Sequence, residues 1–373
     1  MKKILYITTI SSTINAFLVP HIQMLRNQGH MVDCACSIDI PIDDSLINDG
    51  VRVFDIPFSR NPLHPGNIKA FKKLVKIQKE NEYDVVHVHT PVASVYGRLL
   101  KLKFKNLMTI YTAHGFHFYK GAPLINWLVY YPIERIMTKF TDTIITMNSE
   151  DYDRVKKFNI NNTYKVNGVG IDLSKYSINN FNKNEIREKL NLNKEDFIIL
   201  MVAEVNKNKN HKQMIDAINI LKNKGINNIK LLCAGDGTLF DEIKAYIEQK
   251  KLQDKIYMLG FRTDINELMI SCDVGALMSY REGLPRNIME FMACEKNVIG
   301  TDIRGIRDLI QDGVNGYLVE IGNSNDTADK IEYIYKNRIE MKNMEKNSRE
   351  IVSQYEIGKV LDEIKKIYSN CSV

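Results

Sequence analysis

The sequence contains little cysteine, and what it has is scattered. Six of the 373 residues are Cys, and only Cys34 and Cys36 lie close together. No C-x-x-C spacing occurs, so neither a zinc site nor a disulfide framework is indicated. A reducing cytoplasm is therefore the expected compartment.

Long hydrophobic runs are also missing. No window of 18 or more apolar residues occurs, which argues against a membrane-spanning helix. The segment Met1 to Ile7 resembles the start of a signal peptide, but polar residues follow from Thr8, so we expect a first buried strand. A chain of 373 residues exceeds one ordinary core and predicts two domains.

The signatures of several protein classes are absent. No G-x-G-x-x-G follows the first strand, so a dehydrogenase loses its main support, and no G-x-S-x-G or P-loop occurs. Nucleic-acid motifs and the aromatic residues that would stack bases within a basic run are missing too, so no nucleic-acid partner is expected.

Two patterns that could hold a metal ion have simpler explanations. Asp151 and Asp153 form a D-x-D, but Ser149 as N-cap with acids in the first helical turn accounts for it. His87 and His89 could share a strand face, yet the residues around them do not complete a metal site. We therefore expect neither a metal nor another cofactor.

Positive charge is concentrated in the first half of the chain. Residues 1–170 carry 21 Lys and Arg against 14 Asp and Glu, whereas the remainder carries 30 against 31. This indicates either solvated helix faces or attraction to anionic lipids or a polyanionic substrate. The basic residues include Lys69, Lys72, Lys73, Lys76, Lys79, Arg98, Lys101, Lys103 and Lys105.

Apolar strands alternate with amphipathic helices, which predicts an α/β fold with two doubly wound parallel sheets joined near residue 170. Ligands of such sheets bind beyond the carboxyl ends of the strands, here in a cleft between the domains. Strands are expected at 4–8, 31–36, 51–56, 85–89, 108–112, 143–147, 197–202, 230–234, 256–259, 274–278 and 297–300. Helices are expected at 17–28, 68–81, 92–102, 124–139, 214–223, 239–250, 265–271 and 287–293.

Glu282 and Glu290 form the most informative motif. A strand precedes Glu282, and Pro285 is expected to open a helix as its first residue. The N-terminus of a helix binds phosphate, and Glu290 could reach back to it because long helical side chains lean that way. Carboxylates accept hydrogen bonds from paired sugar hydroxyls. The motif therefore indicates a sugar-nucleotide site.

Other polar residues follow strands on the same rim. Gly235-Asp236-Gly237 and Gly260-Phe261-Arg262 are strand-end loops. Lys207, Lys209 and Lys212 follow another strand and could pair with a diphosphate. In the first domain His114 precedes a Gly that permits close backbone approach, so it is the candidate facing the cleft.

Taken together, these residues resemble the retaining glycosyltransferases of family 4, which have the GT-B fold. The resemblance covers nearly the whole chain and is strongest at 197–319, where the E-x7-E motif, the two glycine loops and 312–319 occur in the family's order and spacing. Residues 112–121 resemble members that build bacterial capsule, exopolysaccharide or lipopolysaccharide.

The resemblance implies roles for individual residues. Catalytic positions would be Glu282 beside the donor sugar, Lys209 at the diphosphate and His114 facing the reacting sugar. Glu290 would bind the ribose and the Arg262 loop the base. Glu204 stands where the family usually has Arg, so either Arg262 or Arg286 would supply a second cation, or the diphosphate would be held chiefly by Lys209 and the helix start. Backbone at the helix start would hold the diphosphate, and the donor-binding set is completed by Gly235, Gly283, Leu284, Pro285, Arg286, Asn287 and Ile288.

The expected function is transfer, with retention, of an N-acetylhexosamine-type sugar from a UDP-sugar to a lipid-linked or saccharide acceptor in surface polysaccharide synthesis. Residues 1–170 would bind the acceptor, an undecaprenyl diphosphate at the inner membrane surface, and 171–354 the donor. A last helix at about 355–373 is a candidate to pack on the first domain. Alternatives are an epimerase of the same fold and a non-catalytic UDP-sugar-binding partner protein.

Overall fold

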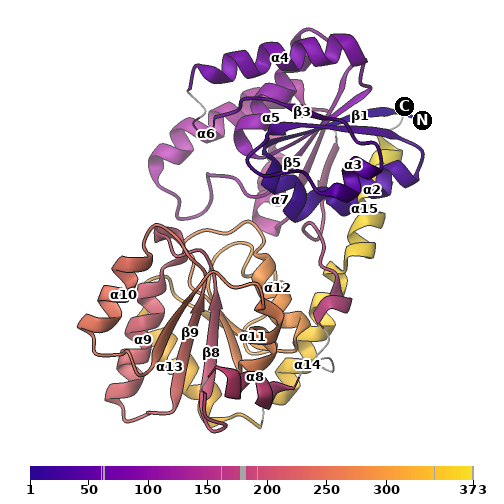
Figure 1. The fold of residues 1–373 in the computed structure, drawn as a ribbon. Helices are drawn as coiled ribbons and strands as arrows, with labels where there is room; N and C mark the ends of the chain where they lie inside the picture. Colours follow the sequence, from indigo (N-terminus) through magenta and orange to yellow (C-terminus); the bar gives the residue numbers. More distant parts are fainter. Residues whose placement is uncertain are drawn as a thin grey trace. The chain divides into compact units, whose positions relative to one another are not determined.

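A computed structural model describes residues 1–59, 61, 64–160, 162–176, 182–190, 192–339 and 341–371. The chain divides into two units, which Figure 1 draws as ribbons. Unit 1 comprises Met1–Gly170 and Gly358–Val373, and unit 2 comprises Ile171–Ile357. Each unit is described below by itself.

Unit 1 is built on a seven-stranded sheet with the order β3-β2-β1-β4-β5-β6-β7. Neighbouring strands are parallel, as expected from apolar strands that helices cover on both faces. The strands are β1 Lys3–Ile10, β2 Met31–Ser37, β3 Val53–Asp55, β4 Val85–His89, β5 Met108–Ala113, β6 Thr143–Thr146 and β7 Asn162–Lys165. The α-helices are α1 Ser11–Thr13, α2 Val19–Asn27, α3 Asp44–Asn48, α4 Gly66–Asn81, α5 Pro91–Arg98, α6 Leu124–Met137, α7 Ser149–Val155 and α15 Ile357–Asn370.

The first helical segment begins earlier than its sequence suggests. A helix was expected from residue 17, but α1 starts at Ser11, and a π-helical segment, Ile14–Leu18, connects it to α2. The Ser11 hydroxyl donates to Asp39, at 2.8 Å, so polar residues at this helix start are bonded to the loop that follows β2.

Helix α15 packs on unit 1 at the end of the chain. Its Tyr368 hydroxyl lies 2.7 Å from His87 Nδ1 and 3.3 Å from the Tyr6 hydroxyl, and Cys371 Sγ lies 3.2 Å from Thr143 Oγ1. These contacts cover a row of buried polar side chains on one face of the sheet.

Unit 2 repeats this strand order in a six-stranded parallel sheet, β10-β9-β8-β11-β12-β13. Alternate residues of β8 enter two hydrophobic clusters, with Ile198 and Leu200 in one and Ile199 and Met201 in the other, so both faces of the sheet are covered. The strands are β8 Phe197–Val202, β9 Ile229–Ala234, β10 Ile256–Gly260, β11 Val274–Leu277, β12 Asn297–Thr301 and β13 Gly316–Val319. The α-helices are α8 Lys183–Lys189, α9 His211–Asn223, α10 Phe240–Gln249, α11 Ile265–Ser271, α12 Arg286–Ala293, α13 Ser324–Lys336 and α14 Met341–Val352.

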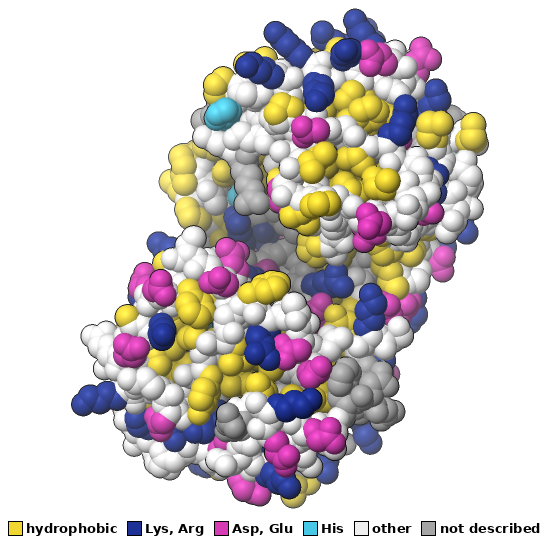
Figure 2. All heavy atoms as spheres, viewed as in Figure 1, with side chains coloured by type: hydrophobic (Ala, Val, Ile, Leu, Met, Phe, Trp, Pro, Cys, Tyr) yellow, Lys and Arg dark blue, Asp and Glu magenta, His cyan; other side chains and the backbone are white. Residues whose placement is uncertain are grey.

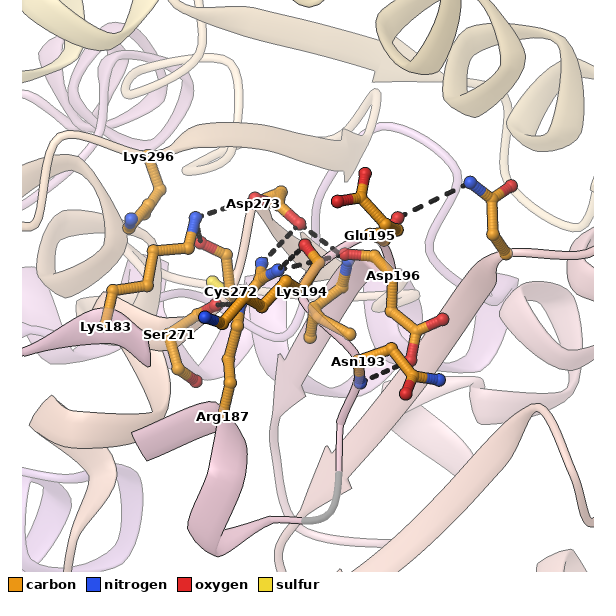
Figure 3. A network of polar contacts seen from close by, with 12 residues as sticks. Lys183, Arg187, Asn193, Lys194, Glu195, Asp196, Ser271, Cys272, Asp273 and Lys296 are labelled. Atoms are coloured by element: carbon orange, nitrogen blue, oxygen red, sulfur yellow. Dashed lines mark hydrogen bonds and ion pairs between the residues drawn. The ribbon is translucent and has the colours of Figure 1, made fainter. Parts of the chain in front are cut away.

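A polar network fastens α8 to the amino ends of two strands of unit 2 (Figure 3). Asp273, directly before β11, accepts from Arg187 and Lys183, each at 2.8 Å, and from the backbone N–H of Ile198 in β8. Burial would raise the pKa of Asp273, but the two cations outweigh that effect and lower it. The network lies at the amino ends of the strands, so it supports the unit from the edge opposite to the predicted ligand site.

Candidate active site

In unit 2, Lys209 and Glu282 meet at the point where the strand order changes direction. Strands β8 and β11 are neighbours in the middle of the sheet. From β8 the chain continues to β9 toward one edge of the sheet, and from β11 it continues to β12 toward the other edge. Such a switch point is where doubly wound sheets bind ligands. Lys209 follows β8 and Glu282 follows β11, and Lys209 Nζ lies 2.6 Å from Glu282 Oε1. The structure thus brings two of the predicted residues into direct contact.

The two loops that carry this ion pair are bonded to each other. The side chain of Asn206 accepts from the Lys209 backbone N–H at 3.1 Å and closes a short turn. The carbonyl of Asn208 accepts from Tyr280 N–H at 2.8 Å, and its amide donates to the Arg281 carbonyl at 3.0 Å. Lys209 and Glu282 are therefore held by backbone contacts on both sides, although their side chains remain 20% and 13% exposed.

A third loop, after β12, contacts the backbone of Glu282. The buried Arg304 side chain donates from Nε to the Glu282 carbonyl at 3.1 Å. Gly305 has φ +76°, and a Cβ there would lie 2.1 Å from the carbonyl oxygen of Gly283. Only Gly permits this approach of the two backbones. Arg304 was not singled out from the sequence, although an Arg in a strand-end loop on this rim was a usable signal.

Glu290 is held by two donors within unit 2. Its Oε1 accepts from the Tyr176 hydroxyl at 2.9 Å and from Arg286 Nε at 3.1 Å. The contact with Arg286, one turn earlier in α12, confirms that the Glu290 side chain leans toward the N-terminus of the helix. Burial raises the pKa of Glu290, and Tyr176 and Arg286 oppose that rise. Nothing in the sequence connected Tyr176 with Glu290, because 114 residues separate them.

The start of α12 differs by one residue from the expectation. Pro285 occupies the N-cap position and Arg286 is the first helical residue, so Pro285 does not open the helix as its first residue. Proline has no N–H, and the N–H of Ile288 already donates to Asn287 Oδ1 at 2.9 Å. The Asn287 amide in turn donates to the Val202 carbonyl at 2.7 Å, which fastens the helix start to β8.

The expected second cations are both paired with acids. Arg262 donates from Nε to Asp264 Oδ1 at 2.8 Å, and this contact lowers the pKa of Asp264. Arg286 is paired with Glu290, as described above. The Glu204 side chain is exposed. Lys209 is accordingly the predicted cation that lies directly beside Glu282.

Gly235 has a clear packing role. Its φ is +147°, and a Cβ there would lie 2.0 Å from the carbonyl oxygen of Ala203. Its N–H donates to the Gly260 carbonyl at 2.8 Å, so the two glycine loops predicted on this rim are in contact.

In unit 1, His114 follows β5 directly and contacts a second histidine. Its Nε2 lies 3.1 Å from Nδ1 of His89, the last residue of β4. Burial, and to a smaller extent the proximity of His21, lower the pKa of His114 to about 4. The ring is therefore neutral at pH 7, with one nitrogen that donates a hydrogen bond and one that accepts.

The D-x-D segment of unit 1 is structural, but its cap is not Ser149. Asn148 is the N-cap of α7, and its side chain accepts from the Asp151 N–H. Asp151 is buried, and its Oδ2 accepts from the Phe116 N–H at 3.1 Å and from Asn148 at 2.9 Å. The acid thus fixes the segment that follows His114.

An apolar pocket of about 520 Å³ lies at the corresponding switch point of unit 1, between the ends of β1 and β4. Thr9 and Thr90, whose hydroxyls are 2.7 Å apart, mark this edge. Helix α6 forms one wall through Val129 and Ile133. Glu134, also in the lining, is paired with the fully buried Arg98 at 2.8 Å. This pocket could not be predicted from the sequence, because its lining comes from distant segments.

Within the described residues, no group of three or more His, Cys, Asp or Glu side chains is placed to hold a metal ion. Both ring nitrogens of His87 are already in hydrogen bonds, to Tyr368 and to Thr112. Across the same residues, no helix has both the length and the apolar character needed to cross a bilayer.

Residues 182–351 match the family described as glycosyl transferases group 1, and residues 3–148 match glycosyl transferase 4-like. The chain is 36% identical to EpsD of Bacillus subtilis, which is named as a proposed glycosyltransferase, over 99% of this chain and 96% of that protein. These matches define a class of enzymes that transfer sugars.

Two more comparisons extend the likeness. The chain is 28% identical, over 93% of its length and 90% of the other's, to the Escherichia coli UDP-Gal:α-D-GlcNAc-diphosphoundecaprenol α-1,3-galactosyltransferase. The solved structure of Anabaena HepE with UDP and glucose superposes with a TM-score of 0.82 at 21% identity, covering 99% of this chain and 100% of that chain. The chain belongs to the glycosyltransferase family of these matches and has the GT-B fold.

Proposed function

We propose that the protein transfers a sugar, of N-acetylhexosamine type, from a UDP-sugar to a lipid-linked acceptor in surface polysaccharide synthesis. The observation that carries the proposal is the contact of Lys209 Nζ with Glu282 Oε1 at 2.6 Å, at the switch point and next to the start of α12. A cation beside a helix N-terminus suits a diphosphate, and a carboxylate beside that cation suits the sugar attached to it.

The chemical step under this proposal is departure of the diphosphate from the sugar. The bond between the anomeric carbon and the phosphate oxygen breaks, and negative charge grows on the leaving group while positive charge grows on the sugar ring. The acceptor hydroxyl oxygen forms the new bond to the anomeric carbon, and the hydroxyl proton passes to the departing diphosphate. Lys209 and the backbone donors of Gly283, Leu284 and Asn287 would stabilise the leaving group. Glu282 would orient the sugar and balance the charge of the ring.

Glu290 is proposed to bind the ribose hydroxyls. Tyr176 and Arg286 both donate to its Oε1, and Oε2 is proposed to accept from a ribose hydroxyl. The loop of Arg262 is proposed to contact the base, and the pairing of Arg262 with Asp264 orients the guanidinium group.

Retention of configuration is part of the proposal. The names of two relatives specify an α-1,3 linkage, the E. coli enzyme and the Campylobacter jejuni N,N'-diacetylbacillosaminyl-diphospho-undecaprenol α-1,3-N-acetylgalactosaminyltransferase, to which this chain is 24% identical. A donor whose sugar is α-linked to the nucleotide gives an α product when configuration is retained. His114 is proposed to contact the reacting sugar.

The acceptor is proposed to be attached to undecaprenyl diphosphate, as the names of those two relatives state for them. The pocket of unit 1 supports this choice, because its lining is mainly apolar and it lies at the switch point. It is proposed to hold the first isoprene units of the lipid.

Docking on the inner face of the membrane is proposed for unit 1. Figure 2 shows hydrophobic side chains gathered over α6 and Lys or Arg side chains gathered over α4. Apolar side chains with basic neighbours bind anionic lipid surfaces. The exposed apolar residues of α6 are Leu124, Ile125, Leu128, Val129, Ile133 and Ile136, and the exposed lysines of α4 are Lys69, Lys72, Lys73, Lys76 and Lys79.

The proposal is tested by measuring UDP release from a panel of UDP-sugars, with and without polyprenyl-diphosphate-linked sugars, in EDTA. Acceptor-dependent UDP release with an α-linked product is the expected result. Release of an epimer without acceptor would replace the proposal by epimerisation, and UDP binding without turnover of any donor would replace it by a non-catalytic role. Loss of activity in EDTA that Mn²⁺ restores would contradict the role given to Lys209.

A further inference from the structure

Three histidines lie in a row on one face of the unit 1 sheet. His87 and His89 alternate along β4 and therefore point to the same face, with ring centroids 4.3 Å apart. His114, which follows the neighbouring strand β5, has its ring centroid 5.4 Å from that of His89. The row leads from the helix-covered interior to the edge where the strands end.

The hydrogen bonds of the row are unevenly distributed. His87 is fully bonded, with Nδ1 at 2.7 Å from the Tyr368 hydroxyl and Nε2 at 2.7 Å from Thr112 Oγ1. His89 Nδ1 lies 3.1 Å from His114 Nε2. The remaining nitrogen of His89, Nε2, is buried and has no hydrogen-bond partner in the described part of the chain. Among the described residues, the His89 ring therefore has one hydrogen-bond contact, and it is to His114.

The contact between His89 and His114 has two possible proton arrangements. Burial lowers the pKa of both rings, so each carries one proton at neutral pH. If His114 Nε2–H donates, the proton of His89 sits on its buried Nε2, an N–H without an acceptor. If His89 Nδ1–H donates, that buried Nε2 is only an unused acceptor. Buried N–H groups without partners are rarer than unsatisfied acceptors, so the second arrangement is favoured.

We propose that His89 is a positioning residue that fixes both the ring orientation and the tautomer of His114. Because Nε2 of His114 accepts from His89, the proton of His114 is on Nδ1, and that N–H is the group offered to a hydroxyl oxygen of the reacting sugar. The inference rests on the proposed function for the identity of the ligand, but not for the tautomer.

The tautomer is measured without substrate. Two-dimensional ¹H–¹⁵N NMR of protein labelled with ¹⁵N-histidine distinguishes protonated from unprotonated ring nitrogens, and the His114→Gln variant identifies the His114 signals. The wild type is expected to show a protonated Nδ1 and an unprotonated Nε2 on His114. In His89→Leu a substantial population of the Nε2–H tautomer is expected. A wild-type His114 protonated on Nε2 would overturn the proposal.

Turnover is compared in three variants whose melting temperatures are also recorded. The Asn amide can take the place of Nδ1, whereas the Gln amide reaches toward the place of Nε2. His89→Leu and His89→Gln should lower kcat for the best UDP-sugar roughly tenfold or more with little change in KM, and His89→Asn should recover most of it. Equal losses in all three variants would mean a structural role and overturn the proposal.

The outcomes separate this inference from the proposed function. If the NMR result holds but no UDP-sugar is turned over by the wild type, the function is wrong and the tautomer assignment stands. If the wild type transfers sugar and His89→Leu keeps its kcat, the positioning role is wrong and the function stands.

Discussion

Glu282 and Lys209 neutralise each other across 2.6 Å, so a change at either residue also alters the surroundings of the other. Glu282→Ala should lower kcat at least roughly a hundredfold, equivalent to about 2.7 kcal/mol, because the sugar loses its orienting carboxylate and Lys209 loses its partner. Steady-state kinetics with the best UDP-sugar measures the effect.

Glu204→Ala is the matched control for that substitution. It removes an exposed acid from the loop that also carries Lys209, and it should leave kcat within about twofold. Unchanged circular dichroism would show that both variants fold. Near-normal turnover of Glu282→Ala would remove Glu282 from the mechanism.

At the scale of the element, α6 presents residues that differ in whether they line the pocket. Ile133 lines it and Ile136, one turn later, is not among its lining residues, while both are partly exposed, at 39% and 58%. Ile133→Asn should weaken binding of farnesyl diphosphate roughly tenfold through loss of apolar contact, and Ile136→Asn should change it less than about twofold. Calorimetric titration with this soluble prenyl probe makes the comparison.

Inorganic diphosphate serves as the second arm of that titration. It should compete poorly, because the pocket wall offers apolar contact. Equal weakening in the two variants, or full competition by inorganic diphosphate, would place the probe outside the pocket.

Helix α8 depends on Asp273, which lies at the amino ends of the strands and forms ion pairs with Lys183 and Arg187 of that helix (Figure 3). Asp273→Asn should lower the free energy of unfolding of unit 2 by about 3 kcal/mol, since the mostly buried Arg187 loses its counter-charge. The control Asp329→Asn removes an exposed partner of Lys224 and should cost less than about 1 kcal/mol. Urea unfolding measures both, and equal effects would contradict the role of burial.

Elements with a strong local pattern were predicted well, and those fixed by distant contacts were not. The central strands and the helix after Pro285 followed from apolar runs and one proline. The edge strands β7 and β13 were missed because neither is fully buried, whereas the equally short strands β6 and β11 are buried throughout and were predicted. Tyr176 beside Glu290 and Tyr368 beside His87 are contacts between residues 114 and 281 positions apart, which no local pattern can reveal.

At the scale of the whole molecule, the histidines with a lowered pKa are distributed unequally between the two units. Burial lowers the pKa of His21, His87, His89 and His114 in unit 1, and of His211 in unit 2. As the pH falls below 6.5, these histidines bind protons in the unfolded chain but remain unprotonated in the folded protein. Their contribution to stability is therefore complete above pH 6.5 and is lost progressively as the pH falls below it. For His114 and His211 this loss continues to about pH 4.

Unit 1 should consequently lose stability faster than unit 2 between pH 6.5 and 5, a range in which most carboxylates remain ionised. Each histidine protonated only in the unfolded state contributes roughly 1.4 kcal/mol per pH unit. Hydrogen exchange of peptides from β4 and β5, compared with β8 and β11, reports both units in the intact protein. Parallel loss of protection in the two units would refute this expectation.

The two places where the chain passes between the units are bonded to each other. Ile171 N–H donates to the Tyr355 carbonyl, and Ile357 N–H donates to the Ile171 carbonyl, each at 2.9 Å. Unit 2 is thus an insertion whose two ends meet, and unit 1 is a discontinuous domain closed by α15. During synthesis, the ribosome completes all of unit 2 before it releases Tyr368, which covers His87. Unit 2 can therefore fold while unit 1, whose first 170 residues are synthesised earlier, still lacks its last helix.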